Sequence, residues 1–182
     1  DREGVIKAQI GEKKEFFING VKQNKVSNIV GKVNIVIFSP DDIEIIKDGP
    51  EKRRKFIDMM ISSLKPAYIQ LLNDYNRVLQ QRNIYLKQII KEGKSENLLD
   101  ILDEQLSDLS YKIFEYRNKY LEKFSNIIQE THDIITKNTK NQEIIKIKYI
   151  SNASEKAGFL NNLKKSRKID LSRGYTSTGV HR

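Results

Sequence analysis

The residues of this sequence best suited to chemistry are basic side chains that gather in two clusters. They are Arg53, Arg54, Lys55, Arg77 and Arg82 in the first cluster, and Lys164, Lys165, Arg167 and Lys168 in the second. Grouped guanidinium and ammonium groups bind phosphate, and the net charge of +9 points to an anionic partner. We therefore expect both clusters to be candidate contacts to nucleic acid.

The distribution of charge along the chain also allows two roles that need no ligand. Residues 51–92 carry nine basic and four acidic residues, and residues 138–182 carry ten and three, whereas residues 93–137 carry six basic and nine acidic residues. Helices of opposite charge attract one another, so the basic groups could pair with the acidic segment instead of a ligand. Lys164–Lys168 could equally cap the C-terminus of a helix, where cations complement the helix dipole.

Signatures of catalysis are absent from the sequence. It contains no Gly-x-x-x-x-Gly-Lys-Ser/Thr loop, no Gly-x-Ser-x-Gly elbow and no histidine pair at metal-ligand spacing. With no cysteine it has no thiolate site and no disulfide, which fits a reducing cytoplasm. The longest uninterrupted apolar run, Ile35–Phe38, is far too short to span a membrane. We expect a cytoplasmic chain without catalytic residues, metal site or cofactor of its own.

The first 38 residues should form β structure. Strand-like runs cover Val5–Ile10, Glu15–Ile18 and Val21–Val26, and Asn19-Gly20 between the last two predicts a type I′ hairpin turn. Asn34–Phe38 is apolar at consecutive positions, which is typical of a strand buried on both faces.

Two short helices should follow. In Ser39-Pro40-Asp41-Asp42 a residue suited to the N-cap precedes a proline at the first helical position, and an acidic residue stands three positions after the cap. This helix should run to about Lys47. The next should begin near Glu51 and end before Lys65-Pro66.

Two long helices should then pack as an antiparallel hairpin. Apolar and aromatic residues recur every three or four positions from Tyr68 to Ile89 and from Leu99 to Ile134, which is a coiled-coil spacing. Gly93 lies in the short link between them and suits the end of a helix. Helices of this length exceed what most globular cores require, so we expect an arm that projects from a body.

The last part of the chain should form a strand, a helix and a loop. Residues 144–150 alternate, with Lys146 and Lys148 on one face and Ile145, Ile147 and Tyr149 on the other. Ser154 should cap a helix that ends in the second basic cluster. The final residues, 173–182, are small, polar and rich in glycine.

Two separated stretches resemble the RecF family of bacterial recombination mediators. The first is Asn34–Asn83, which includes the Ser-Pro-Asp-Asp segment at 39–42, Gly-Pro-Glu-Lys-Arg-Arg-Lys-Phe-Ile-Asp at 49–58 and Tyr-Asn-Arg-Val-Leu-Gln-Gln-Arg-Asn at 75–83. The second includes Leu163, Arg167, Asp170, Gly174, Thr176, Gly179, His181 and Arg182 and resembles the approach to that family's Gly-Pro-His-Arg-Asp-Asp motif, although Val180 stands in the place of the proline. With the variable helical region between the two stretches, the resemblance covers essentially the whole chain.

The resemblance implies an SMC-like, ABC-type ATPase head that dimerises around ATP and Mg²⁺. Such a protein binds single-strand/duplex DNA and works with RecO and RecR to load recombinase at gaps. In this family the P-loop precedes the matched region, and the signature and Walker B segments follow it. We therefore expect the middle of a longer, weakly active ATPase, in which the nucleotide motifs lie elsewhere.

The resemblance also predicts an α+β organisation and two motif sites. Residues 1–38 would be the β segment of the ATP-binding lobe, residues 39–142 a helical lobe, and residues 143–182 the return strand, a helix and the approach to the signature region. Ser39, Asp41 and Asp42 occupy the place of a nucleotide-sensing loop, and helix capping explains Ser39 and Asp42 equally well. His181 and Arg182 match the family motif.

A competing hypothesis gives the helical arm a protein-docking or dimerisation role without DNA contact. In that case the basic groups pair with the acidic helix, and Tyr111, Tyr116 and Tyr120 would supply the interface if they are exposed. A third interpretation, a helical scaffold unrelated to ATPases, requires both family matches to be coincidental.

Overall fold

The structure, a computed structural model, describes residues 4–11, 13–32, 39–137 and 143–182. Its elements, in chain order, are strands β1 (Ile6–Ile10), β2 (Lys14–Ile18) and β3 (Val21–Gln23), 3-10 turns η1 (Val26–Asn28) and η2 (Pro40–Ile43), and helices α1 (Glu44–Lys47), α2 (Pro50–Leu64), α3 (Pro66–Glu92), α4 (Asn97–Thr136) and α5 (Lys156–Arg173). The expected α+β fold with a helical hairpin and a small antiparallel sheet is confirmed. None of the described helices has both the length and the apolar character needed to cross a membrane.

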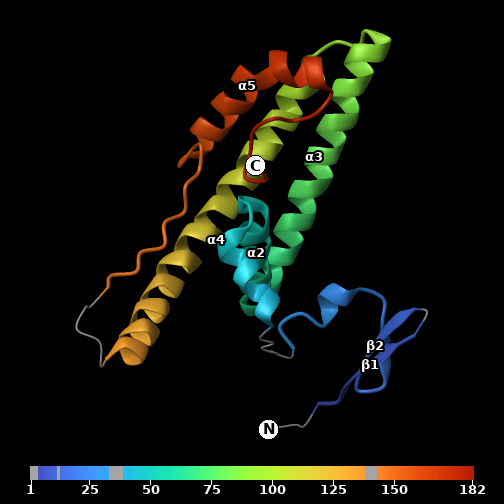
Figure 1. Ribbon diagram of the computed structural model, residues 1–182. Helices are drawn as coiled ribbons and strands as arrows, with labels where there is room; N and C mark the ends of the chain where they lie inside the picture. Colours follow the sequence, from blue (N-terminus) through green and yellow to red (C-terminus); the bar gives the residue numbers. More distant parts are fainter. Residues whose placement is uncertain (1–3, 12, 33–38, 138–142) are drawn as a thin grey trace.

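The three strands form an antiparallel sheet in the order β1-β2-β3. Asn19 and Gly20, between β2 and β3, both have positive φ angles, of 49° and 82°, as a type I′ turn requires. β3 ends earlier than expected, at Gln23, and η1 follows it. The predicted buried strand, Asn34–Phe38, lies outside the described residues. The sheet lies beyond α2, at the opposite end of the molecule from α5 (Figure 1).

The long helices α3 and α4 form the expected antiparallel hairpin, with α2 packed against both (Figure 1). α3 ends at Gly93, whose φ of 67° is left-handed and suits glycine. The shared core is built from residues at the predicted spacing, such as Tyr68, Tyr75, Leu106 and Ile113. At 40 residues α4 is about 60 Å long, and its C-terminal part extends beyond α2.

Helix α5 differs from the expectation at both ends. Its N-cap is Glu155 rather than Ser154, and no side chain caps it. It continues to Arg173 and closes at Gly174, whose φ is 70°. The basic cluster Lys164–Lys168 therefore lies in the middle of the helix, where it cannot complement the dipole at the C-terminus, and the capping hypothesis is wrong.

The predicted return strand, 144–150, is extended but pairs with no strand among the described residues. Instead it follows α4, whose side chains bond to part of its backbone: Gln129 Oε1 accepts the amide of Ile145 at 2.7 Å. The predicted alternation holds, because Ile145, Ile147 and Tyr149 are half-buried while Lys146 and Lys148 are exposed. We call residues 143–152 the strap.

The C-terminal residues, 174–182, fold back into the helical body and are called the tail. The sequence pattern indicates only a small, polar loop here, but Thr176 and Val180 are buried. Figure 1 shows the chain end between α3 and α4. Burial of a polar segment requires hydrogen-bond partners from the helices around it.

Candidate nucleic-acid interface

Arg82, a member of the first basic cluster, is buried inside the protein and cannot be part of a surface interface. Its side chain is 0% exposed. Nε donates to Asp103 at 2.6 Å, and Nη1 donates to Asp170 at 2.8 Å and to the hydroxyl of Thr176 at 2.9 Å. A phosphate of DNA cannot reach it, so the expectation that Arg82 contacts DNA is corrected. Its position among the apolar seam residues of α3 is the sequence signal for burial.

The partners of Arg82 extend into a buried polar network that holds the tail. Asn83 Oδ1 accepts from both the amide and the hydroxyl of Thr176, at 2.8 and 2.7 Å. Asp170 Oδ1 accepts from the amide and hydroxyl of Ser177, at 2.9 and 2.6 Å. Helices α3, α4 and α5 and the tail therefore meet at one charged centre, which we call the Arg82 network.

Arg167, in the second basic cluster, is also committed to internal contacts. Its Nη2 lies 2.6 Å from Asp100 Oδ1 and 2.7 Å from Asp103 Oδ2. The hydrogen bond from Arg167 lowers the pKa of Asp100. For this residue the hypothesis that basic groups pair with the acidic helix is the correct one, and Arg167 joins α5 to α4.

The remaining residues of the second cluster face solvent. Lys164, Lys165 and Lys168 are exposed on α5. No ion pair of theirs occurs within the described parts of the chain. They form an exposed basic surface on α5, with Asp100 close enough to Lys164 for the lysine charge to help lower the pKa of that carboxyl.

Arg53, Arg54 and Lys55 form the corresponding surface on α2. Arg53 Nη1 donates to the backbone carbonyl of Asp48 at 2.7 Å, which fixes the guanidinium near the end of α1. Among the described residues none of the three is in an ion pair, and Arg53 and Lys55 are exposed. Arg77 is 68% exposed and pairs with Asp74 at 3.0 Å, a contact of the weak surface kind.

A second buried arginine, Arg117 of α4, anchors the end of the tail. It donates to both carboxylate oxygens of Asp58, from Nε at 2.9 Å and Nη2 at 2.8 Å. Its Nη1 donates to the carbonyl of Val180 at 2.8 Å and to the hydroxyl of Tyr149 at 2.9 Å. One side chain thus joins α4, α2, the strap and the tail.

The motif residues His181 and Arg182 lie on the tail next to this anchor. His181 Nδ1 is 2.6 Å from the hydroxyl of Tyr75, and the Arg182 guanidinium lies over the ring of Tyr175, 5.2 Å from its centroid. Burial, followed by the charge of Arg182, lowers the pKa of His181 to about 4. The ring is therefore neutral at pH 7. Gly179 has a φ of 136°, and a Cβ there would lie 2.8 Å from the Tyr75 hydroxyl.

Acid is expected to destabilise the chain through His181. The pKa of His181 is near 6.5 in the unfolded chain and about 4 in the folded one, so the unfolded state binds more protons between these values. The stability is therefore complete above about pH 6.5 and decreases as the pH falls toward 4. Urea unfolding at pH 7, 6 and 5 should show a shallower decrease for His181→Asn than for the unchanged chain. The same slope in both, or an equal change in the control His132→Asn, would contradict this assignment.

The predicted nucleotide-sensing loop is used for helix capping as far as it is described. Asp42 Oδ2 accepts the backbone amide of Ser39 at 2.7 Å, which is one half of a capping box. The side chain of Asp41 lies outside the described part. Helix capping therefore accounts for Asp42, and the nucleotide-sensing role of this loop stays a prediction. No three potential metal ligands come together among the described residues.

The tyrosines of the docking hypothesis are half-buried on α4. The rings of Tyr116 and Tyr120 stack with their centroids 6.3 Å apart. The ring of Tyr116 also packs against that of Tyr68, with 5.1 Å between the centroids. The hydroxyl of Tyr111 donates to Glu115 at 2.9 Å. These rings contribute part of their surface to the core and part to solvent.

The residues that organise the tail are not among those predicted from the sequence. Asp103, Arg117 and Asp170 resemble the ordinary solvated charges of a helix, yet all three are buried. A signal is present, because Asp103 falls four residues after Leu99 and Arg117 four after Ile113, on the apolar face. A charged residue at such a position indicates a buried partner on another element.

Comparisons with known proteins agree with the resemblance. No protein-family model matches the chain. It is 40% identical over 172 residues to the DNA replication and repair protein RecF of Streptococcus gordonii, covering 91% of this chain and 46% of that protein. It is 38% identical over 186 residues to RecF of Acetivibrio thermocellus, covering 97% and 50%. The chain therefore spans about half the length of these curated relatives.

Solved structures show the same relation. A structure described as the recombination mediator protein RecF with ATPrS in the RecFOR pathway superposes with a TM-score of 0.84 at 36% identity, over 97% of this chain and 49% of that one. The structure described as RecF with ATP superposes with a TM-score of 0.82 at 37% identity, over 93% of this chain and 47% of that one. In sequence and in fold, therefore, this chain is homologous to about half of RecF, the DNA replication and repair protein.

Proposed function

We propose that this chain is the helical lobe of a RecF-like DNA replication and repair protein and that it contacts DNA phosphates. One observation carries the proposal. The buried cations Arg82 and Arg117 and the half-buried Arg167 are paired with carboxylates, whereas Arg53, Arg54 and Lys55 on α2 and Lys164, Lys165 and Lys168 on α5 are in no ion pair among the described residues. These groups form two surfaces that are available to an external anion.

The charge that remains unpaired suits a polyanion. Five of these six cations are exposed on their helices, and Arg54 is half-buried. Cations that bind phosphate release condensed counterions from DNA, which favours binding at low salt and gives it little dependence on base sequence. Arg77 can add a further contact, because an exposed pair with Asp74 is weak enough to exchange for phosphate.

For the whole protein we propose the activities of its relatives. The related structures are described as a recombination mediator with ATP or an ATP analogue in the RecFOR pathway, which supports ATP as a ligand and RecR and RecO as partners. We propose ATP- and Mg²⁺-dependent dimerisation, weak ATPase activity, recombinase loading at single-strand gaps, and a cytoplasmic location for that protein. The present chain contributes the helical lobe to these functions.

A docking role for the arm is the second candidate. The partly exposed stack of Tyr116 and Tyr120 supports it, as do Ile134 and Ile135 near the end of α4, which are 75% and 76% exposed. Aromatic and aliphatic surface of this kind suits a protein partner. RecR pull-down with Tyr116→Ala/Tyr120→Ala separates the candidates: lost RecR capture with unchanged DNA affinity supports docking.

Charge reversal on α2 tests the DNA proposal. For about four phosphate contacts, log Kd should change with log salt with a slope of roughly 4. We expect Arg53→Glu/Arg54→Glu to weaken binding to a labelled single-strand/duplex junction about tenfold or more at moderate salt and to lower that slope by about 2. Fluorescence anisotropy from low to high salt measures both quantities.

The matched control is Lys119→Glu/Lys123→Glu, which makes the same change in net charge on exposed positions of α4. It should weaken binding much less, because α4 lies outside the two proposed surfaces. Absence of binding at low salt, or equal loss in both double variants, would refute the local assignment.

A further inference from the structure

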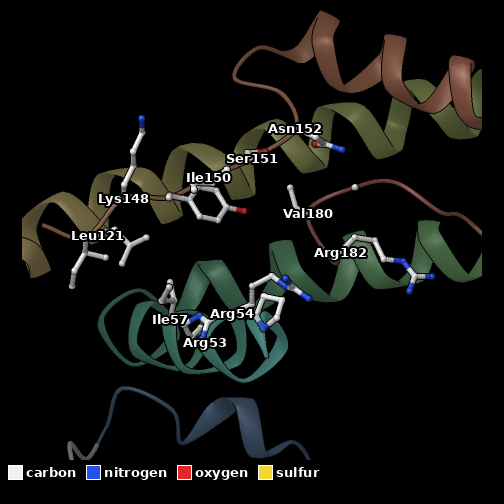
Figure 2. A pocket seen from close by; sticks show the side chains of 14 residues that line it. Arg53, Arg54, Ile57, Leu121, Lys148, Ile150, Ser151, Asn152, Val180 and Arg182 are labelled. Atoms are coloured by element: carbon white, nitrogen blue, oxygen red, sulfur yellow. The ribbon is translucent and has the colours of Figure 1, made fainter. Parts of the chain in front are cut away.

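A hollow of about 470 Å³ opens between α4 and the junction of α2 with α3, and we call it the tyrosine hollow. Figure 2 shows a different pocket, where Arg53 and Arg54 of α2 lie opposite the strap and which shares no lining residue with the tyrosine hollow. The volume of the tyrosine hollow is within the range of ligand sites. Its lining consists of Lys65 at the junction and Lys112, Glu115, Tyr116, Lys119 and Tyr120 from α4.

Four hydrogen-bond donors of this hollow have no partner inside the fold. The hydroxyls of Tyr116 and Tyr120 form no hydrogen bond with any described residue. Lys65 and Lys119 are exposed, and their ammonium groups form no hydrogen bond or ion pair with the described part of the chain. Donors that converge on one hollow without acceptors of their own are available to a ligand that supplies acceptors.

The charge of the tyrosine hollow is positive in excess. Glu115 is the acidic residue in its lining, and this carboxylate already accepts the hydroxyl of Tyr111 at 2.9 Å. Lys112 is paired with Asp108 at 2.7 Å, outside the lining. The charges of Lys65 and Lys119 therefore remain without a counter-charge. A ligand with carboxylates would supply both the missing charge and the missing acceptors, because charge-assisted hydrogen bonds to ammonium are the strong ones.

Two stacked rings give the same hollow a fixed aromatic surface. The ring planes of Tyr116 and Tyr120 are only 8° from parallel. Tyr116 rests in turn on Tyr68, which is fully buried and whose hydroxyl donates to Asp58 at 2.7 Å. Rings fixed before binding lose little entropy when a partner arrives. Half-buried tyrosines suit a protein interface because each offers apolar area together with a polar hydroxyl.

The surrounding charge favours a protein segment over a nucleic-acid strand as the ligand. Residues 93–137 carry nine acidic and six basic residues, and Glu115 lies in the hollow itself. A strand with a phosphate at every nucleotide would meet these carboxylates along α4. A peptide can instead place one or two carboxylates on Lys65 and Lys119 and an apolar side chain on the rings, so that its charges match the site.

We propose that the tyrosine hollow docks a short acidic segment of a protein partner, with carboxylates on Lys65 and Lys119 and an apolar or aromatic side chain on the rings of Tyr116 and Tyr120. The inference rests on the docking role given above as the second candidate function, and it does not depend on the DNA contact. It adds the chemistry of the partner segment. It also adds Lys65, which lies outside α4, as a contact residue.

Selection from a library of short random peptides tests the chemistry without assuming a partner. The displayed library is selected on the unchanged chain and, in parallel, on Lys65→Glu/Lys119→Glu. We expect the peptides enriched on the unchanged chain to combine acidic residues with an aromatic or large aliphatic one, and the variant to lose this enrichment. Enriched peptides without acidic residues, or the same acidic peptides from both proteins, would show that the proposal is wrong.

Fluorescence anisotropy with one enriched peptide measures the individual contacts. Lys65→Gln/Lys119→Gln should weaken peptide binding about fivefold or more. Tyr116→Phe/Tyr120→Phe, which keeps both rings and removes the hydroxyls, should weaken it about threefold. The matched control Lys164→Gln/Lys168→Gln removes two exposed lysines of α5 and should change the affinity less than about twofold. Equal losses in the two lysine double variants would indicate general attraction to a basic chain and overturn the site.

Two further comparisons separate this proposal from the proposed functions. If oligo(dT) displaces the peptide and loses as much affinity as the peptide does in Lys65→Gln/Lys119→Gln, the hollow binds nucleic acid and the protein assignment is wrong. If RecR capture requires Tyr116 and Tyr120 but no acidic peptide is enriched, the docking role stands and the acidic chemistry is wrong. If RecR capture is insensitive to both tyrosines while the peptide contacts hold, docking of RecR fails and the acidic site stands.

Discussion

Arg82→Met should lower the free energy of unfolding by about 3–5 kcal/mol, the range measured when one partner is removed from a buried ion pair. Methionine matches the aliphatic part of the arginine side chain but leaves Asp103 and Asp170 buried without their shared cation; both are 0% exposed. The hydroxyl of Thr176 loses a donor as well. Urea denaturation at pH 7, followed by circular dichroism, measures the change.

Two controls separate the lost ion pair from a general effect of substitution. Arg77→Met, on the exposed face of the same helix, should change stability by no more than about 0.5 kcal/mol. Combining Arg82→Met with Asp170→Asn removes the carboxylate charge that is left without a cation and should recover roughly 2 kcal/mol, since Asp103 keeps Arg167 as its partner. If the single variant loses less than about 1 kcal/mol, or if the double variant is less stable than the single one, the Arg82 network does not hold the fold as described.

Arg117→Met should lower stability by about 2–3 kcal/mol and release the end of the tail. The variant loses the two-point contact with Asp58 and leaves the carbonyl of Val180 without its donor. The loss should be smaller than for Arg82, because Asp58 is 20% exposed and water can replace part of the contact. Tyr68 also continues to donate to Asp58, at 2.7 Å.

Release of the tail is measured by hydrogen exchange. Amides of residues 176–182 should exchange roughly tenfold faster in Arg117→Met than in the unchanged chain. Amides in the middle of α3 should exchange no faster than the lower global free energy of unfolding of the variant requires. The control Lys119→Met, two positions away on the exposed face of α4, should change neither quantity. Uniformly faster exchange in all helices would show that Arg117 stabilises the fold generally and has no specific role at the tail.

The helical hairpin is the part of the fold that local sequence predicts best. Apolar residues at spacings of three and four, prolines at the starts of α2 and α3 and Gly93 at the end of α3 are all local signals. Each depends only on the geometry of a few neighbouring residues, which is the same wherever the helix lies. The Asn19-Gly20 turn is predictable for the same reason.

The errors fall where a segment is defined by contacts that are distant in sequence. Residues 144–150 have the alternation of a strand, but alternation also suits a strap lying on α4, and only the partner distinguishes the two. The basic cluster of α5 suggests a helix end because cations are common there, yet the helix continues beyond it and closes at Gly174. The polar tail has the composition of a surface loop, because its burial depends on donors from α3 and α4.

By itself, the sequence determined the helices and their apolar faces, the β-hairpin, and the relation to RecF. The tertiary structure decided which charges remain available. Arg82 forms ion pairs inside the fold with carboxylates 21 and 88 residues away, whereas Arg53 and Arg54, equally basic, form no ion pair with any described residue. The physical reason is that helix propensity and apolar periodicity act between near neighbours, while the pairing of a charge depends on which distant carboxylate the packed helices bring within about 3 Å.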